Sequence, residues 1–387
     1  MKRPQVWLET THTVSGGQTG RTGVGHYTEE CISHLTALDH DHDYTLVGNV
    51  FATAKPHLPK LLEPDRVKVR LSRMFPGKVW NQMFKRGIMP PLNVTIPGRP
   101  DLVVFFNFVR YPLTRGVKSA VVIHDLTFER YPEAVQGRNL AYLHKFVPRA
   151  VREATQVIAV SEATKRDLVN QYQLPDEKVS VVWPGVDLYR YRPGLETSGV
   201  RGRFGLPEHF FLFLSTIEPR KNILTLIRAY HSLPEATRRN YGLVLSGKVG
   251  WKADEIMAEI RKGDPVGTIL HTGYVPDEDI PALYAAADAF VLPSLFEGFG
   301  MPAAEAMACG VPVITADNSS LPEIVDGAGI MVEAMDTAGW TREMERLALD
   351  PKLRAELAAK GRARAELFSW DNSARQLKAV IDRLLPD

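Results

Sequence analysis

Short apolar runs alternate with amphipathic stretches along most of the chain. In the first half, such runs predict buried strands at residues 6–8, 44–50, 67–71, 102–106, 121–123, 157–160 and 179–182. In the second half, they predict strands at residues 210–215, 243–246, 289–292, 311–315 and 329–332. Stretches with helical spacing of apolar residues lie between or after these runs, at 26–38, 161–172, 279–287, 301–309, 337–368 and 372–385. Strands that alternate with helices are typical of the α/β fold class with parallel sheets.

One segment interrupts this alternation. Residues 189–205 are rich in Gly, Arg and Tyr and show little apolar periodicity, which is typical of a linker. A chain of 387 residues is long enough for two domains of ordinary size. We therefore expect two Rossmann-like domains, an N-terminal one over residues 1–192 and a C-terminal one over residues 193–368.

The two halves differ in charge, although the formal net charge is only +2. Through Arg192, 26 basic residues stand against 18 acidic ones, and in the remainder 21 stand against 27. This asymmetry indicates a different partner for each half, and we expect no nucleic acid among them.

The cysteines and the apolar runs bear on the compartment. Cys31 and Cys309 both fall in predicted helices, and two cysteines make no disulfide framework, which favours a reducing cytoplasmic setting. No apolar run approaches the ~20 residues that span a bilayer. The N-terminal sequence MKRPQVWLE lacks a signal-peptide core.

Residues 290–314 predict a strand, a glycine turn, a helix and a second strand. Gly298 and Gly300 flank Phe299 in the turn, and the helix begins at Met301. The N-terminus of such a helix presents unpaired N–H groups and the positive end of the helix dipole. This turn therefore suits an anion such as a phosphate.

Two carboxylates frame this turn. Glu297 precedes the helix, and Glu305 lies about one helical turn inside it. Carboxylates gain nothing from a single phosphate, but they accept hydrogen bonds from vicinal hydroxyls. The pair favours a ligand in which phosphate lies between hydroxyl-rich groups, which is the layout of a nucleotide sugar.

Arg220 and Lys221 lie at a strand-to-helix loop of the second half. Two adjacent cations at this place would neutralise a diphosphate without a metal ion. The alternative is a solvent-exposed basic turn.

The chain begins with a strand, a glycine-rich loop over residues 10–25 and a helix, as a Rossmann-like domain does. Glycines allow the backbone to approach a ligand closely. The loop lacks a G-x-G-x-x-G sequence, so a dinucleotide site and an oxidoreductase are disfavoured, and a surface loop without a ligand is the alternative.

His124 and Asp125 directly follow the predicted strand at 121–123. Parallel sheets bind ligands at the carboxyl ends of their strands, so a functional role for His124 is one interpretation. A purely structural histidine is the other.

Basic and apolar residues interleave over residues 73–92. Lys and Arg next to aromatic residues on a short amphipathic segment are typical of contact with an anionic membrane surface. A helix that faces the core and exposes a basic side is an equal alternative.

These motifs together resemble a retaining glycosyltransferase of family 4. In the second half the resemblance rests on EPRKN at 218–222, SGK at 246–248, TGYV at 272–275 and PSLFEGFGMPAAEAMACGVPVI at 293–314, in which Glu297 and Glu305 form the E-x7-E pattern. In the first half it rests on the glycine loop at 16–25, the HD pair at 124–125, VSEATKRDL at 160–168 and PGVD at 184–187. The resemblance covers nearly the whole chain and is looser in the first half.

The resemblance implies a GT-B fold, in which two Rossmann-like domains face each other across a cleft. It also implies that the last helix, over residues 369–387, crosses back onto the first domain. The first domain would bind the acceptor and the second the nucleotide sugar.

The resemblance further implies residue roles. Arg220 and Lys221 would hold the donor diphosphate, Glu297 the hydroxyls of the transferred sugar, and Glu305 the ribose, while His124 would lie beside the reacting sugar. The remaining donor-binding residues would be Gly16, Gly17, Gly25, Gly273, Tyr274, Val275, Phe299, Gly300 and Met301. On the acceptor side we expect Asp125, Ser161 and Lys165.

The expected reaction needs neither a metal nor another cofactor, and the acceptor attacks the face from which the nucleoside diphosphate departs. The sequence RTGVGHY at 21–27 resembles bacterial mannosyltransferases of surface-polysaccharide synthesis, which favours GDP-mannose as donor over a UDP-hexose. A saccharide or polyprenyl-linked saccharide acceptor at the inner membrane face would explain the basic first half. A nucleotide-sugar epimerase and a binding module without catalysis stay as alternatives.

Overall fold

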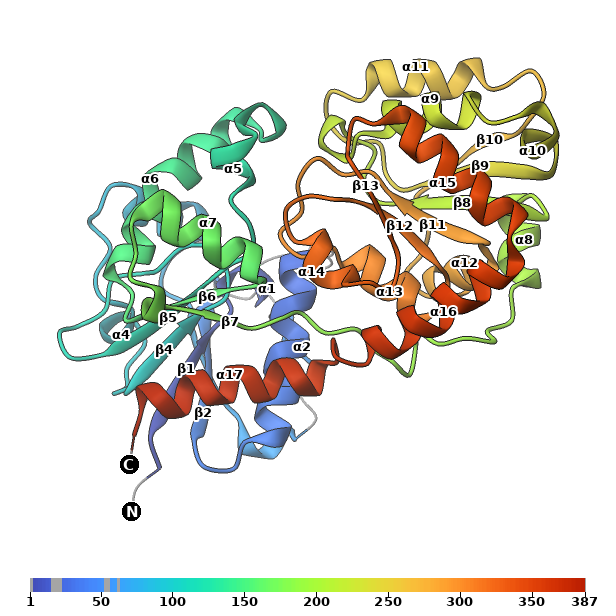
Figure 1. The fold of residues 1–387 in the computed structure, drawn as a ribbon. Helices are drawn as coiled ribbons and strands as arrows, with labels where there is room; N and C mark the ends of the chain where they lie inside the picture. The colour runs from blue at the N-terminus through green and yellow to red at the C-terminus, as the bar shows by residue number, and fades with distance from the viewer. Residues whose placement is uncertain (1–2, 15–22, 52–55, 61–62, 387) are drawn as a thin grey trace. The chain divides into compact units, whose positions relative to one another are not determined.

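The computed structural model describes residues 3–14, 23–51, 56–60 and 63–386, and the chain divides into two units (Figure 1). Unit 1 consists of Met1–Gly185 and Trp370–Asp387, and unit 2 consists of Val186–Ser369. The boundary between the two units lies after Gly185, whereas the sequence predicted it after residue 192. The linker interpretation of residues 189–205 is wrong, because they belong to unit 2 and contain helix α8 (Ser198–Phe204).

Unit 1 is built on a seven-stranded parallel sheet with the strand order β3-β2-β1-β4-β5-β6-β7 (Figure 1). Its strands are β1 (Gln5–Glu9), β2 (Asp43–Asn49), β3 (Lys68–Ser72), β4 (Leu102–Phe105), β5 (Lys118–Ile123), β6 (Gln156–Ala159) and β7 (Val179–Val181). Each overlaps a predicted apolar run. The inner strands are covered on both faces and read as continuous apolar segments, whereas the edge strand β3 is largely exposed.

Helices cover both faces of this sheet. They are α1 (Thr11–Val14), α2 (Gly23–Leu38), α3 (Gly77–Lys85), α4 (Leu92–Thr95), α5 (Thr127–Arg130), α6 (Gly137–Glu153), α7 (Glu162–Tyr172) and α17 (Trp370–Leu384), with short 3-10 turns η2 (Pro64–Arg66), η3 (Pro132–Ala134) and η4 (Asp176–Lys178). Helix α1 lies inside the segment at 10–25 that was expected to be a glycine loop. Residues 11–14 of that segment are therefore helical.

The segment at 73–92 contributes to the core of unit 1. The buried side chains of Trp80 and Phe84 belong to the same cluster as Tyr111 and Phe146. The rings of Phe84 and Phe146 stack with centroids 4.6 Å apart. The aromatic side chains of this segment therefore face the core, and its basic side chains are exposed.

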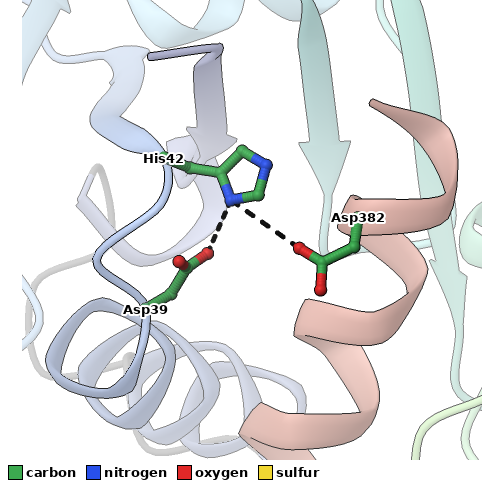
Figure 2. Close-up of side chains that lie close together, drawn as sticks. All are labelled: Asp39, His42 and Asp382. Carbon is green, nitrogen blue, oxygen red and sulfur yellow. Dashed lines mark hydrogen bonds and ion pairs between the residues drawn. The ribbon is translucent and has the colours of Figure 1, made fainter. Parts of the chain in front are cut away.

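Helix α17 packs against α2, so the end of the chain belongs to unit 1, as the resemblance implies. Figure 2 shows part of the attachment: His42 Nδ1 bonds to Asp39 Oδ2 at 2.8 Å and lies 3.9 Å from Asp382 Oδ1. The ammonium of Lys378 lies 2.9 Å from Asp41 Oδ2 and 3.0 Å from Asp382 Oδ1. Charged groups of α17 thus pair with the turn between α2 and β2.

Unit 2 is built on a six-stranded parallel sheet with the strand order β10-β9-β8-β11-β12-β13. Its strands are β8 (His209–Leu214), β9 (Tyr241–Ser246), β10 (Ile269–Gly273), β11 (Ala289–Leu292), β12 (Val313–Ala316) and β13 (Ile330–Val332). Its other helices are α9 (Ile223–His231), α10 (Glu235–Asn240), α11 (Asp254–Lys262), α12 (Ile280–Ala286), α13 (Met301–Ala308), α14 (Leu321–Val325), α15 (Thr337–Leu349) and α16 (Pro351–Ala365), with the 3-10 turn η5 (Pro219–Lys221).

The single helix expected over residues 337–368 is wrong, because the structure has two helices there. Helix α15 ends at Leu349, and α16 begins with Pro351. Asp350 caps α16, since its side chain accepts a hydrogen bond from the N–H of Leu353 at 2.9 Å. Proline at the first helical position and an aspartate before it start a new helix.

Candidate functional site

The glycine turn before α13 presents free backbone donors. Gly300 has φ +107, a conformation that favours glycine, and a Cβ built on it would lie 2.7 Å from Leu321 Cδ2. In the described part of the chain, no acceptor pairs with the N–H groups of Phe299, Gly300 and Met301. These groups stand at the positive end of the α13 dipole, so the turn is suited to bind an anion.

A serine pair fixes this turn from the loop that precedes α14. Ser320 Oγ donates to the carbonyl groups of Glu297 (3.0 Å) and Phe299 (2.7 Å). The N–H of Glu297 donates to Ser319 Oγ at 3.0 Å. Sequence reasoning missed both serines, although the polar sequence NSS directly before α14 was a usable signal.

Lys221, Arg220 and Glu297 come together as expected. Lys221 Nζ lies 2.6 Å from Glu297 Oε1, and an Arg220 Nη lies 3.3 Å from Glu297 Oε2. The second guanidinium contact of Arg220 is to Glu218 Oε1 at 2.7 Å. Lys221 is buried and Arg220 is partly buried, so the alternative of a solvent-exposed basic turn is wrong.

Opposing effects act on the pKa values of the contacting pair Lys221 and Glu297. Burial on its own would raise the pKa of Glu297, but the charges of Lys221 and Arg220 outweigh it and hold the pKa at about 2. Burial lowers the pKa of Lys221, and Glu297 opposes that shift. The 2.6 Å contact and the low pKa of Glu297 identify a buried ion pair.

Asn222 holds the cationic loop against two neighbouring loops. It has φ +56, and its Nδ2 donates to the carbonyl groups of Pro293 (3.1 Å) and Ala334 (2.7 Å). Its Oδ1 accepts a hydrogen bond from Thr225 Oγ1 at 2.7 Å. The left-handed conformation places Arg220 and Lys221 at the end of one short turn before α9 begins.

Glu305 lies in a different environment from Glu297. Tyr284 donates a hydrogen bond to Glu305 Oε2 at 3.0 Å, and the hydroxyl of Tyr191 donates a second one. Burial raises the pKa of Glu305 to about 7, although both hydroxyls act in the opposite direction. The two carboxyl groups of the E-x7-E pattern therefore titrate in different pH ranges, Glu297 near pH 2 and Glu305 near pH 7.

Gly273, Tyr274 and Val275, which are expected near the nucleobase of the donor, lie at and just after the carboxyl end of β10. Gly273 ends β10 with φ +72, and Tyr274 is 49% exposed. Lys248 Nζ lies 4.4 Å from the centroid of the Tyr274 ring. The side chain of Val275 is buried, and the role of all three residues stays a prediction.

His124 lies at the carboxyl end of β5, as expected. Its Nε2 bonds to the carbonyl of Phe106 at 2.8 Å, and its ring stands edge-on to Tyr27 with centroids 5.1 Å apart. A carbonyl only accepts, so Nε2 carries the proton and Nδ1 is unprotonated. Burial lowers the pKa of His124, so the ring is neutral at physiological pH.

The other expected residues of unit 1 have local partners. Asp125 Oδ1 accepts from the N–H of Thr127 at 2.8 Å, and Ser161 Oγ caps α7 by accepting from the N–H of Thr164 at 3.0 Å. Lys165 pairs with Asp176 at 2.7 Å and lines a pocket between α7, β7 and α17. Their acceptor role stays a prediction.

Of the glycines expected on the phosphate side, Gly25 is buried in the first turn of α2. Gly16 and Gly17 lie outside the described residues. Their role also stays a prediction.

Among the residues that the structure describes, one group has the composition of a metal site: Asp39, His42 and Asp382 (Figure 2). Asp39 already accepts hydrogen bonds from His42 and from Tyr44, the latter at 2.6 Å. The ammonium of Lys378 supplies positive charge beside Asp382. These three side chains therefore contribute to the contacts that hold α17 against the turn between α2 and β2.

In the described part of the chain, no helix has both the length and the apolar character needed to cross a membrane.

The two parallel-sheet units and the site around Glu297 define a glycosyltransferase with the GT-B fold. Residues 201–364 match the family described as "Glycosyl transferases group 1", and residues 21–190 match "Glycosyltransferase Family 4". The chain belongs to glycosyltransferase family 4, and it resembles the mannosyltransferases of surface-polysaccharide synthesis.

Curated relatives agree with this assignment. O-antigen chain mannosyltransferase B of Escherichia coli is 34% identical over 261 residues, which cover 67% of this chain and 68% of that protein. The serotype-specific mannosyltransferase WbdA of Escherichia coli is 31% identical over 280 residues, covering 69% of this chain and 34% of the longer relative. D-inositol 3-phosphate glycosyltransferase of Salinispora arenicola is 34% identical over 248 residues, covering 60% of this chain and 55% of that protein.

Solved structures agree on the fold. Sucrose-phosphate synthase from Thermosynechococcus elongatus has a TM-score of 0.71 at 19% identity, covering 99% of both chains. WaaG, a glycosyltransferase involved in lipopolysaccharide biosynthesis, has a TM-score of 0.68 at 18% identity, covering 99% of this chain and 100% of that one.

Proposed function

We propose that the chain transfers mannose from GDP-mannose to a saccharide or lipid-linked saccharide acceptor, with retention at the anomeric carbon. The observation that carries the proposal is the cluster of Lys221, Arg220 and Glu297 in the unit that also holds the free N–H groups before α13. The names of the E. coli mannosyltransferases support mannose as the transferred sugar.

The residues of unit 2 supply what departure of a nucleoside diphosphate requires. Negative charge grows on the bridging oxygen, and cations with preorganised N–H groups stabilise it without reorganisation. In this proposal Arg220, Lys221 and the start of α13 have this role, which their charges and the N–H groups of the turn support. Glu297 then accepts hydrogen bonds from the sugar hydroxyls, and Glu305 from the ribose.

We assign no covalent nucleophile. Glu297 is the carboxylate nearest the cations, but its pKa of about 2 reflects strong stabilisation of its charge by Lys221 and Arg220, which lowers its nucleophilicity. Attack from the face of the departing phosphate, which takes the acceptor's proton, accounts for retention without such an intermediate.

The first experiment compares Arg220→Ala/Lys221→Ala with the unchanged chain. We expect donor turnover to fall at least 100-fold, because two charge-assisted contacts to the leaving group are lost. The double change leaves Glu297 buried without a countercharge, so circular dichroism checks that the variant is folded. The single variant Arg220→Ala keeps the ion pair between Lys221 and Glu297 and serves as the second variant. Turnover within a few-fold in both folded variants would refute the diphosphate role.

The donor is identified separately. A thermal-shift panel of GDP-mannose, GDP, UDP-glucose and UDP should show the largest stabilisation with the two guanine nucleotides. A larger shift with the UDP compounds would replace GDP-mannose by a UDP-hexose. Release of an isomerised nucleotide sugar without any acceptor would favour an epimerase instead.

Metal independence is tested with EDTA. Two cations and a helix N-terminus supply positive charge for the diphosphate, so we expect the rate to be unchanged. A loss of activity that Mg²⁺ restores would contradict this expectation.

We also propose that unit 1 contacts an anionic membrane surface through the segment at 73–92. Its aromatic side chains are used by the core, which leaves Arg73, Lys78, Lys85 and Arg86 exposed together with Met74, Val79 and Ile88. Exposed lysines and arginines bind anionic lipids by charge, and the exposed apolar side chains add insertion.

Flotation with phosphatidylglycerol-containing vesicles tests the membrane contact. Changing Arg73, Lys78, Lys85 and Arg86 to Gln should abolish flotation. The matched control changes four exposed basic residues of unit 2 (Arg342, Arg346, Lys352 and Lys360) to Gln and should float normally. Equal flotation of both variants would overturn the proposal.

A further inference from the structure

Two tyrosine side chains of unit 2, which we call the tyrosine pair, hold the carboxyl of Glu305. Tyr284, on α12, donates a hydrogen bond to Glu305 Oε2 at 3.0 Å, and the hydroxyl of Tyr191 donates to the same carboxyl. The rings of the pair stand edge-on, with centroids 6.1 Å apart. Tyr284 is fully buried and Tyr191 is 6% exposed, whereas Glu305 is partly exposed. Glu305 is therefore the member of this group that a ligand can reach.

The acceptor positions of Glu305 suit a ligand with two neighbouring hydroxyls. An ionised carboxyl has about four acceptor positions on its two oxygens and no donor. The tyrosine pair uses two of these positions. The other two correspond to the two O–H groups of a vicinal diol, such as that of a ribose. A carboxyl that is already held in place loses less conformational freedom when the diol binds.

A turn at the start of unit 2 sets the position of Tyr191. The chain enters unit 2 at Val186, and Asp187 follows as the last residue of the PGVD sequence. The side chain of Asp187 accepts hydrogen bonds from the N–H groups of Tyr189 at 3.0 Å and Arg190 at 3.1 Å. Its carbonyl accepts from the N–H of Tyr191 at 2.8 Å. The side chain of Asp187 is exposed, so its contacts serve the turn and not the core.

Arg190 attaches this turn to the rest of unit 2. Its guanidinium donates to the carbonyl of Asp277 and lies 5.4 Å from the centroid of the Tyr191 ring. Tyr191 is thus held through its backbone by Asp187 and over its ring by Arg190.

The groups around Glu305 act in opposite directions on its ionisation. Burial raises its pKa to about 7, the tyrosine pair and Arg190 act to lower it, and the charge of Asp277 acts to raise it. The thiol of Cys309, whose pKa burial raises to about 12, is neutral near neutral pH. The ionised carboxyl only accepts hydrogen bonds, whereas the protonated one carries a donor. A diol therefore pairs better with the ionised form, which the tyrosine pair favours.

We infer that the tyrosine pair positions Glu305 for the two ribose hydroxyls of the donor, and that Asp187 in turn positions Tyr191. The inference rests on the proposed function, because that function assigns the ribose to Glu305. It adds that ribose recognition depends on three positioning residues outside the E-x7-E pattern. It also gives the PGVD sequence a role, since its aspartate acts on the donor site through Tyr191.

The first test compares the binding of GDP and 2′,3′-dideoxy-GDP by calorimetric titration at pH 8. In Tyr284→Phe, which keeps the ring against Phe290, the Kd for GDP should rise about three- to tenfold, the scale of one hydrogen bond. The Kd for the dideoxy nucleotide should change by less than about twofold, because the hydroxyls that Glu305 would bind are missing. Tyr191→Phe should give the same pattern.

The matched control is Tyr230→Phe on α9 of the same unit. It also removes a buried tyrosine hydroxyl, one that donates to the carbonyl of Tyr241 at 2.9 Å. It should leave both Kd values unchanged. A melting curve verifies that each variant is folded.

A pair of substitutions at Asp187 tests the turn. Asp187→Ala removes the acceptor for two backbone N–H groups, whereas Asp187→Asn keeps an oxygen at that place. The Kd for GDP should rise about threefold or more in the alanine variant and stay within about twofold in the asparagine variant. An equal rise in both variants would overturn the role of Asp187 in the turn.

A pH profile separates positioning from packing. The diphosphate of GDP-mannose keeps its charge near neutral pH, so a pH-dependent affinity reports on the protein. In the unchanged chain the affinity for GDP-mannose should increase from about pH 6 to pH 8, as Glu305 ionises. Loss of one phenol donor raises the pKa of Glu305 further, so the increase should move to higher pH in Tyr284→Phe but not in Tyr230→Phe.

Two results would overturn the inference. One is an equal loss of affinity for GDP and 2′,3′-dideoxy-GDP in the variants of the tyrosine pair. The other is an unchanged Kd for GDP in these variants together with an unchanged pH profile. Failure of the proposed function would show instead as the absence of GDP and GDP-mannose binding to the unchanged chain.

Discussion

At the scale of single residues, the site of unit 2 depends on a buried ion pair. Lys221 and Glu297 are both less than 10% exposed, and their 2.6 Å contact compensates for the removal of two charges from water. Breaking one partner of such a pair is costly, whereas replacing both by apolar groups is often nearly neutral. The pair therefore has a measurable signature that separates its structural role from its binding role.

We predict that Glu297→Gln lowers the free energy of unfolding by about 3–5 kcal/mol, because Lys221 stays buried without a countercharge. Glu297→Gln/Lys221→Met should recover most of this loss but should not restore mannosyl transfer. Urea denaturation and a transfer assay measure the two effects. Transfer by the stabilised double variant would show that the pair serves only the fold.

Glu305 predicts a pH dependence of stability with the opposite sign from that of a salt-bridged acid. Its pKa is about 7 in the folded chain, against an ordinary value of 4.5. Between these values the folded chain holds a proton that the unfolded chain has lost, so this residue makes stability fall as the pH rises from about 4.5 to 7.

Glu305→Gln should remove that contribution while keeping acceptor capacity for Tyr284 and Tyr191. We expect the variant to be more stable than the unchanged chain above pH 7 and to differ little from it below pH 4.5. Thermal melts from pH 4 to 8 test this. A constant difference between the two chains across that range would contradict the assigned pKa.

At the scale of elements, the sequence predicted the strands well and the ends of helices less well. Apolar runs marked both sheets because parallel strands are covered on both faces. The helix expected over 337–368 is divided in the structure at Asp350 and Pro351, which carry a start signal. Glu297 and Lys221 were found from local motifs, whereas Ser320 was missed because its contacts to the glycine turn are long-range.

The requirement for glycine at position 300 is also not visible in the local sequence. It comes from φ +107 and from the close approach of Leu321, which lies on a later helix. We predict that Gly300→Ala weakens donor binding 10-fold or more, since the turn must shift to relieve the Cβ contact. Adding Leu321→Ala removes the contact but not the backbone strain, so it should restore binding only in part. Titration of GDP-mannose into each variant measures this, and full recovery in the double variant would mean that the strain is unimportant.

At the scale of the whole molecule, the division into two units depends on contacts that no local pattern contains. The chain leaves unit 1 after Gly185 and returns at Trp370, and Val186 and Ser369 form a bridge beside these crossings. The composition of residues 189–205 suggested a later boundary, because the tertiary pairing of the two crossings is invisible in the sequence. The number of units and their fold class were nevertheless predictable from the alternation of strands and helices.

The last helix completes unit 1 with residues more than 300 positions away from their partners in the chain. His34 bonds to Asp371 at 2.8 Å, and Lys378 lies between Asp41 and Asp382, 3.9 Å from the fully buried carboxylate of Asp39. Tyr44, His42 and the N–H of Asp41 hold Asp39 in place, and both Lys378 and Asp382 of α17 contact this group.

We predict that Lys378→Met destabilises unit 1 by about 2 kcal/mol, the scale of hydrogen bonds to charged groups. Hydrogen exchange should increase in α17, α2 and the start of β2, while unit 2 keeps its protection, because each unit has its own sheet and core. The control Lys360→Met breaks an exposed pair with Glu356 on α16 and should change exchange by little. An equal increase in both units after Lys378→Met would mean that they unfold as one body, and that α17 stabilises the whole chain rather than unit 1.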